Sequence, residues 1–230
     1  MKLFNTKGFF CAHSIFDGRF SSPMLAIDKT EANTLAKKVR GFLDLQSYIN
    51  ENEVHFTNPK DKITCGVMLD RIGMSSIENI NIETFQDYIK KFVAIVSDVL
   101  DIQKFARFGF RVVYIDQRDS MEEAIKNIYK ISTLDQKIIK GVGDLTGFMI
   151  RFSTDKHGLK TNISINPGQN QNIVINTEGS EVNVKYGIFI DVDMYIEEMI
   201  TLKKLNVFLD DTSRHLKNEV FAMLNSIEVR

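Results

Sequence analysis

Two pairs of charged residues have the types and the spacing that could do chemistry. Arg107 and Arg111 lie four residues apart, with Gly109 midway between them. In an extended segment, residues at even spacing share one face, so the two guanidinium groups would flank a gap able to hold a carboxylate or a phosphate. Gly109 would permit a close approach of a ligand to the backbone. The competing structural interpretation is that the arginines pair with acidic residues of this chain.

The second pair, Asp191 and Asp193, ends a strongly apolar run and also shares one face of an extended segment. Carboxylates at a strand end can bind a divalent cation or act as an acid and a base. Glu197 and Glu198 follow closely, but their spacing matches no established metal motif, so ion pairing with the arginines is favoured. We predict no metal, no cofactor and no assigned catalytic residue. The predicted ligand-binding residues are Arg107, Arg111, Asp191 and Asp193.

Histidine offers a further route to catalysis. His215 follows Asp211 by four residues, a helical spacing that can orient an imidazole. The sequence has no G-x-S-x-G element that would supply a serine nucleophile. A metal-dependent hydrolase that uses Asp191, Asp193 and His215 is therefore the alternative, and a non-enzymatic binding module is favoured. The amide-rich stretch from Pro167 to Asn172 is a candidate recognition loop or a simple turn.

Strict alternation predicts the strand that carries the arginines, from Phe105 to Ile115, with Phe108, Phe110, Val112 and Tyr114 on the opposite face. In the first half we predict a strand over Phe9–Phe16, a short extended piece over Pro23–Ile27, a helix capped by Thr30, a hairpin of Val54–Phe56 and Ile63–Leu69, and a long helix capped by Asn81. In the second half we predict a helix that begins at Ser120, four strands over Leu145–Phe152, Lys160–Asn166, Asn172–Thr177 and Val182–Ile190, and a final helix over Asn206–Ser226.

This element order reads as strand, short helix, antiparallel strands and long helix, twice over. We therefore predict an α+β protein in which antiparallel sheets are backed by long helices and the unit is duplicated, with halves at 1–101 and 102–230. The same order resembles folds related to the TATA-box-binding protein. It is also similar to the helix-grip order of cavity proteins that bind lipids and hormones.

A resemblance to one family can be stated on residues. Asp101-Ile102-Gln103-Lys104-Phe105-Ala106-Arg107-Phe108-Gly109-Phe110-Arg111-Val112-Val113-Tyr114 resembles a helix that leads into an Arg-x-Gly-Leu-Arg-Tyr-x-Asn-Arg strand. That strand marks a sporadically distributed, uncharacterised prokaryotic protein family. Phe189-Ile190-Asp191-Val192-Asp193 is similar to the Leu-Asp-x-Asp strand end of the family. The segment from Leu205 to Leu224, with His215 and Phe221, resembles its closing helix.

The resemblance covers about half of the chain, from roughly Ile82 onward, and this sequence departs from the pattern at two places. Val112 and Val113 replace the tyrosine and its neighbour, and Asp116-Gln117-Arg118 replaces Asn-Arg. The family has no established activity, so the resemblance supports the architecture and leaves the function open. Its patchy distribution suggests a phage or defence association.

The composition and charge of the chain limit the classes of partner that we expect. The net charge is −1 with interspersed signs, and this disfavours nucleic acid, which calls for a basic face. No apolar window reaches the length of a membrane span, and no signal-peptide pattern follows Lys7, so we expect a cytoplasmic protein without a membrane partner. Cys11 and Cys65 fit free thiols in a reducing compartment. We predict a binding module for an acidic protein segment or a small anion, and a homo-oligomer; a structural subunit of a larger complex is a further alternative.

Overall fold

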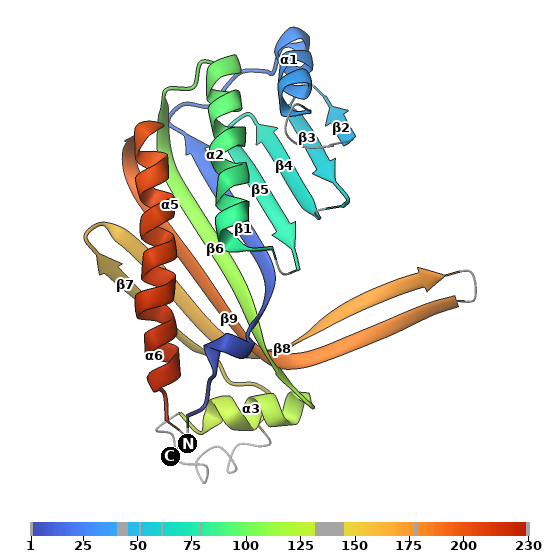
Figure 1. The fold of residues 1–230 in the computed structure, drawn as a ribbon, viewed down its shortest axis with the longest axis vertical. Coiled ribbons are helices and arrows are strands. Elements are labelled where there is room, and N and C mark those ends of the chain that lie inside the picture. The colour runs from blue at the N-terminus through green and yellow to red at the C-terminus, as the bar shows by residue number, and fades with distance from the viewer. Residues whose placement is uncertain are drawn as a thin grey trace.

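A computed structural model describes residues 2–40, 46–50, 52–60, 62–78, 80–131, 145–176 and 179–228. Within these ranges nine strands form one sheet in the order β2-β3-β4-β5-β1-β6-β9-β8-β7, and every neighbouring pair is antiparallel (Figure 1). The strands are β1 (Phe10–Phe20), β2 (Gln46–Ile49), β3 (Glu53–Asn58), β4 (Ile63–Met68), β5 (Arg71–Ile77), β6 (Lys104–Arg118), β7 (Ile150–Lys156), β8 (Leu159–Asn176) and β9 (Gly179–Thr201).

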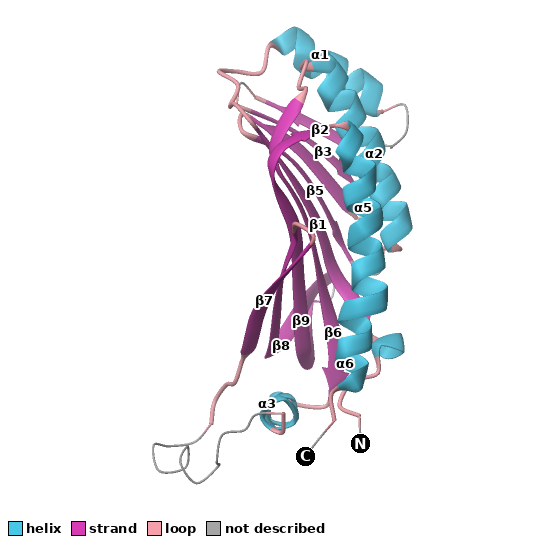
Figure 2. Cartoon of the chain, turned by 90° about the vertical axis from the view of Figure 1, so that its left-hand side faces the viewer, coloured by secondary structure: helices cyan, strands magenta, loops and turns pink. Residues whose placement is uncertain are grey.

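Helices lie along one side of this sheet and across one of its ends (Figure 2). They are α1 (Lys29–Val39), α2 (Ile82–Val99), α3 (Met121–Tyr129), and α5 (Lys203–His215), which continues through a π-helical turn (Leu216–Val220) into α6 (Phe221–Ser226); a short 3-10 turn (Thr6–Gly8) precedes β1. Figure 2 shows α2 and the α5–α6 helix on one side of the sheet, with the other side bare and concave. We call that bare side the uncovered face. Strands backed by helices confirm the predicted α+β class.

Alternation along β6 builds the core beneath the helices. Phe108 and Phe110 are fully buried. The Phe110 ring lies 6.1 Å from that of Phe85 in α2, and the Phe108 ring lies 5.9 Å from that of Phe208 in α5. Burying a side chain of this size contributes about 1.5–3 kcal/mol. The phenylalanines therefore hold β6 in a fixed orientation, and the residues between them must face the other way.

Two of the three predicted helix caps are confirmed. The Asn81 side chain accepts a hydrogen bond from the Thr84 N–H at the start of α2, and Ser120 does the same for Glu123 at the start of α3. The predicted cap at Thr30 is wrong, because Asp28 caps α1 in a reciprocal capping box with Glu31. The helix begins where the carboxylate can accept the first free N–H groups.

The first half holds more strands than the sequence indicated. β2 and β5 were not predicted, and the expected extended piece over Pro23–Ile27 is no strand. In β5 the buried positions are Ile72, Met74 and Ser76, so a serine stands where an apolar residue would have completed the alternation. The Pro23–Ile27 segment makes only an isolated strand-like contact, from the Met24 N–H to the Leu69 carbonyl at 2.7 Å.

The predicted four-stranded meander of the second half is wrong, because two long strands replace three of its pieces. β8 runs without a break through Pro167-Gly168 and pairs with β9 from Lys160–Tyr195 to Asn176–Gly179. Proline is tolerated there because the pairing of β7 ends at Ile150–Ile165, which leaves the outer edge of β8 without a partner strand among the described residues. The turn between β7 and β8 lies at His157-Gly158, where both residues have positive φ.

β8 and β9 continue beyond the body of the protein as a two-stranded arm. The pairing of β6 with β9 ends at Arg118–Tyr186, and residues 170–176 and 179–185 then project away from the body (Figure 1). Two opposed glycines mark its root. A Cβ atom on Gly168 would lie 2.7 Å from the Phe189 ring, and one on Gly187 would lie 2.6 Å from the Ile115 side chain. Only residues without a side chain fit where the three strands crowd together.

The two halves of the sequence share this one sheet. β1 and β6 pair from Phe10–Ile115 to Phe20–Phe105, so hydrogen bonds cross the predicted boundary between 101 and 102. Cys11 and Cys65 are both buried and free, on different strands. None of the described helices is long and apolar enough to cross a membrane.

Candidate functional site

The four predicted ligand-binding residues gather on the uncovered face. Arg107 and Arg111 alternate with the buried phenylalanines of β6, and Asp191 and Asp193 alternate with buried Ile190, Val192 and Met194 of β9. The register sets Arg111 directly opposite Asp193. Both strands therefore present charged side chains to the same side of the sheet, as the sequence predicted. We call these four residues the arginine–aspartate cluster.

Each arginine of the cluster binds one aspartate of the neighbouring strand. The Arg111 guanidinium donates two hydrogen bonds to Asp191, from Nε at 2.8 Å and from Nη2 at 2.7 Å. Arg107 approaches Asp193 more loosely, with 3.5 Å between Nη2 and Oδ2. Two parallel hydrogen bonds fix the plane of a guanidinium group, whereas a single long contact does not. Arg111 is thus firmly held and Arg107 is the looser of the two.

Arg107 fills the space that Gly109 leaves. Its guanidinium lies over that glycine, 3.5 Å from where a Cβ would stand, and stacks 4.4 Å from the centre of the Tyr195 ring. The predicted gap between the two arginines is therefore occupied by Arg107 itself. Its Nε is buried and has no hydrogen-bond acceptor among the described residues. An unsatisfied donor of this kind favours the arrival of an external acceptor.

Burial and charge act in opposite directions on the carboxylates. The pKa of Asp193 is raised, because burial outweighs the stabilising effects of Arg107, Asn162 and Arg111 on the charged form. The pKa of Arg111 is raised by its hydrogen bonds to Asp191. His13 lies on β1, opposite Val113 of β6, and its pKa is lowered by burial and by the Arg111 charge. The cluster is therefore an electrostatically coupled unit rather than four separate side chains.

A cavity of about 460 Å³ opens over the cluster. Arg151 of β7 lines it, and the Arg151 side chain makes no ion pair or hydrogen bond within the part of the chain that the structure describes. Asp17 lies at the other side, where it pairs with Arg19 at 3.0 Å. The complete lining is Ile15, Asp17, Arg107, Gly109, Arg111, Arg151, Asn162, Ser164, Asp191 and Asp193.

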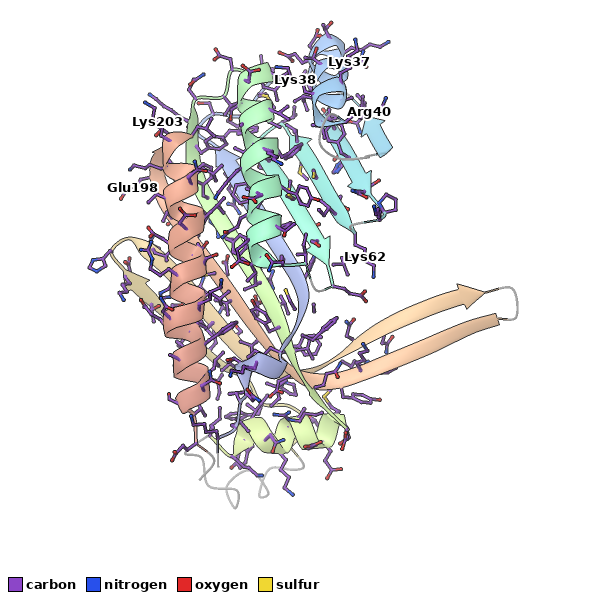
Figure 3. All side chains as sticks on the ribbon, viewed as in Figure 1. Lys37, Lys38, Arg40, Lys62, Glu198 and Lys203 are labelled. Atoms are coloured by element: carbon purple, nitrogen blue, oxygen red, sulfur yellow. The ribbon has the colours of Figure 1, made fainter. Side chains whose placement is uncertain are left out.

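The carboxylates do not assemble a metal centre among the described residues, where no group of three histidines, cysteines or acidic residues comes together. Asp191 and Asp193 lie inside β9 and not at a strand end, because β9 runs on to Thr201. Glu197 is held by Lys160 at 2.7 Å, and Glu198 lies at the end of β9 near the start of α5 (Figure 3). Neither glutamate lines the cavity.

His215 is separated from the cluster by the sheet itself. It lies on the helix side, with Nε2 3.2 Å from the buried Thr161 hydroxyl and Nδ1 2.9 Å from Glu219. The predicted partner, Asp211, instead accepts from Arg214 at 3.1 Å. The structure therefore does not bring His215 to Asp191 and Asp193. The stretch from Pro167 to Asn172 is also no loop, since it lies within β8.

Sequence reasoning missed five lining residues of this site, and three of them, Asp17, Arg151 and Asn162, carry a charge or an amide. A signal existed for each of these three, because they alternate with apolar residues on their strands: buried Phe16 and Ile163, and partly buried Phe152. Their distance from the cluster along the chain concealed the connection, and only the strand order brings β1, β7 and β8 beside β6 and β9. No protein-family model matches this chain, and no curated protein matches it.

Proposed function

We propose that this protein is a non-enzymatic binding module that recognises an anionic ligand on the uncovered face. The observation that carries the proposal is the cavity over the arginine–aspartate cluster, with the Arg151 guanidinium, unpaired among the described residues, at its wall. Guanidinium groups bind carboxylates and phosphates in planar, two-point geometry. The preferred ligand is the carboxylate-bearing segment of an acidic protein partner, and a small anion is the second candidate.

An arriving carboxylate has two points of attachment. Arg151 offers a guanidinium that no described residue binds, and Arg107, whose contact with Asp193 is long, can turn toward the ligand. Asp193 then loses a cationic neighbour, and its raised pKa favours proton uptake by this half-buried carboxyl. Arg111 remains bound to Asp191 and keeps the floor of the cavity in place.

The charge balance of the cavity argues against nucleic acid as the ligand. Three arginines of its lining stand against three aspartates, so the wall has no basic excess. A polyanion is bound by neutralising many phosphates, which needs such an excess. The basic side chains Lys37, Lys38 and Arg40 lie at α1, at one end of the molecule (Figure 3), and Lys38 is paired with Asp98 at 2.5 Å.

The proposed architecture is a duplicated unit related to the TATA-box-binding protein. Its support is the mirrored strand order, in which the first strand of each half, β1 or β6, lies at the centre and is flanked outward by the last strand of that half, β5 or β9. Each half also ends in a long helix on the same face of the sheet. A phage or defence setting rests on the family resemblance alone.

The test is direct binding of a labelled acidic peptide, hexaglutamate, followed by fluorescence anisotropy. Arg151→Gln should weaken binding on the order of fivefold, the effect of about 1 kcal/mol for one exposed ion pair. The matched control is Arg214→Gln, which removes an exposed arginine from the helix side, where its partner is Asp211. Citrate and inorganic phosphate serve as competitors that separate a small anion from a peptide. Equal binding by both variants, or none by the unmodified protein to any of the three, would remove the cavity as an anion site.

A further inference from the structure

One long strand edge has no partner strand among the residues that the structure describes. β7 covers the outer edge of β8 only as far as the Ile150–Ile165 pair, and no other described strand pairs with β8 from Asn166 to Asn176 on that side. Along this stretch the outer backbone groups of β8 have no strand partner among the described residues, although the Pro167 carbonyl accepts from the Asn166 side chain at 3.3 Å. Such an edge is a template for another strand.

The sequence does not protect this edge in the ways that are usual for exposed strands. Charged residues, proline or short length normally block pairing between edges. The β7 edge carries Arg151, Asp155 and Lys156, and the edge at the other end of the sheet, β2, spans only Gln46–Ile49. From Gly168 to Asn176, in contrast, the sequence reads Gly-Gln-Asn-Gln-Asn-Ile-Val-Ile-Asn, without charge or proline.

The arm is also too slight to stand alone. Beyond Tyr186, where its pairing with β6 ends, it consists of β8 and β9 only, and a two-stranded ribbon is marginally stable in water. A third and fourth strand would remedy this. The β9 side carries Glu181 and Lys185, so the neutral β8 side is the edge that is open to pairing.

We propose that the β8 edge of the arm pairs with the same edge of a second copy of this chain. The two strands run antiparallel about a two-fold axis at Ile173, which gives a four-stranded sheet in the order β9-β8-β8-β9. In such a pair only the residue on the axis faces its own copy, and the other residues face different positions of the same uncharged stretch, so no charges meet across the contact. In this register Asn170 faces Asn176 of the partner subunit, and Ile173 faces its own copy.

The reach of the arm makes room for both subunits. Pro167 lies six residues from the axis at Ile173, so the two arm roots stand about 40 Å apart at an extended rise near 3.4 Å per residue. The two bodies then lie at opposite ends of the shared sheet. The cavity over the arginine–aspartate cluster stays outside the interface, so the dimer does not depend on the proposed anion binding.

The first test is the mass of the full chain in solution, measured by light scattering over a range of concentrations. The unmodified protein should give twice the 26.3 kDa of one chain. Ile173→Lys should give a monomer, because it sets two ammonium groups against each other at the axis. The matched control, Val184→Lys, adds the same charge to β9 and should remain a dimer. Circular dichroism melts confirm that both variants fold.

The second test fixes the register. Residues facing each other in antiparallel strands have Cα atoms about 4.5–5.5 Å apart, within the range of a disulfide. Ile173→Cys should therefore cross-link two chains on mild oxidation, whereas Val184→Cys, on the outer strands, should not. The two native cysteines are buried and do not interfere. A protein that is monomeric at every accessible concentration, or a dimer that Ile173→Lys leaves intact, would overturn the proposal.

Discussion

Gly187→Ala tests whether the crowding at the arm root is as tight as the structure shows. A Cβ atom at Gly187 would lie 2.6 Å from the Ile115 side chain and 2.7 Å from the Asp116 backbone carbonyl oxygen. The side chain of Ile115 can rotate, but the carbonyl belongs to β6, whose next residue, Gln117, pairs with Gly187 itself. Relief therefore requires the end of β6 to move away from β9.

The expected cost follows from this geometry. Ordinary contact for a methyl group begins near 3.4 Å, so the backbone must shift by roughly 0.7 Å, and forced overpacking of this kind costs about 1–3 kcal/mol. For a chain of this size 1 kcal/mol corresponds to about 2–4 °C in Tm. We expect Gly187→Ala to melt about 2–12 °C lower than the unmodified protein.

The assay is a thermal melt followed by circular dichroism, with two companion variants. Gly168→Ala meets only the Phe189 ring, which can turn, so its loss should be smaller. Gly73→Ala on β5 has no atom within 4 Å of the added methyl group and should be neutral or stabilising by about 0.5–1 kcal/mol. The reasoning would be refuted if Gly187→Ala had the same Tm as Gly73→Ala, at or above the Tm of the unmodified protein.

Four more outcomes are expected. Phe92→Ala empties a fully buried site beside the Phe56 ring and should cost about 3–5 kcal/mol in urea unfolding. Asp193→Asn should stabilise the protein relative to the parent at pH 7 more than at pH 4. Because the pKa of Asp193 is raised in the folded protein, the folded parent holds this proton more tightly than the unfolded chain and loses stability as the pH rises above the unfolded value near 3.8. Thermal melts of both proteins at the two pH values check this. A double-mutant cycle of Arg111→Ala and Asp191→Ala, measured by urea unfolding, should give a coupling free energy of about 0.5–1 kcal/mol, because the ion pair is partly exposed. A coupling free energy of zero would mean that the two hydrogen bonds do not form in solution. Cys65, whose pKa is raised to about 12 by burial, should react with a thiol reagent in the folded protein far more slowly than after unfolding.

The sequence predicted the parts of this fold that depend on local periodicity. Arg107 and Arg111 alternate with phenylalanines whose burial fixes the face, and Asn81 and Ser120 cap helices with groups that act within three residues. The missed pieces depend on distant partners. Ser76 reads as a polar residue until β5 is packed between β1 and β4, and Pro167 reads as a turn until its edge is known to lack a neighbour.

In the candidate site, too, local patterns could be predicted from the sequence and contacts between distant strands could not. The pairing of the arginines with Asp191 and Asp193 was one of two interpretations open at the level of sequence, and the register of β6 with β9 brings these groups together. Arg151 was not predicted, because only the order β6-β9-β8-β7 places it beside the cluster. Whether the cavity binds an anion stays a prediction, for which the Arg151→Gln experiment is the test.

The strand order has a consequence for synthesis of the chain. Strands β2, β3, β4, β5 and β1 are contiguous in the sheet and come from residues that leave the ribosome before β6. The first half can therefore fold with β1 as its temporary outer strand, and Lys104 follows Ile77, the end of β5, by an interval that takes on the order of a few seconds to translate. During that time β1, with Phe16 and Phe20 along its length, is an open edge on a nascent chain, and a chaperone that shields it would raise the yield of folded protein.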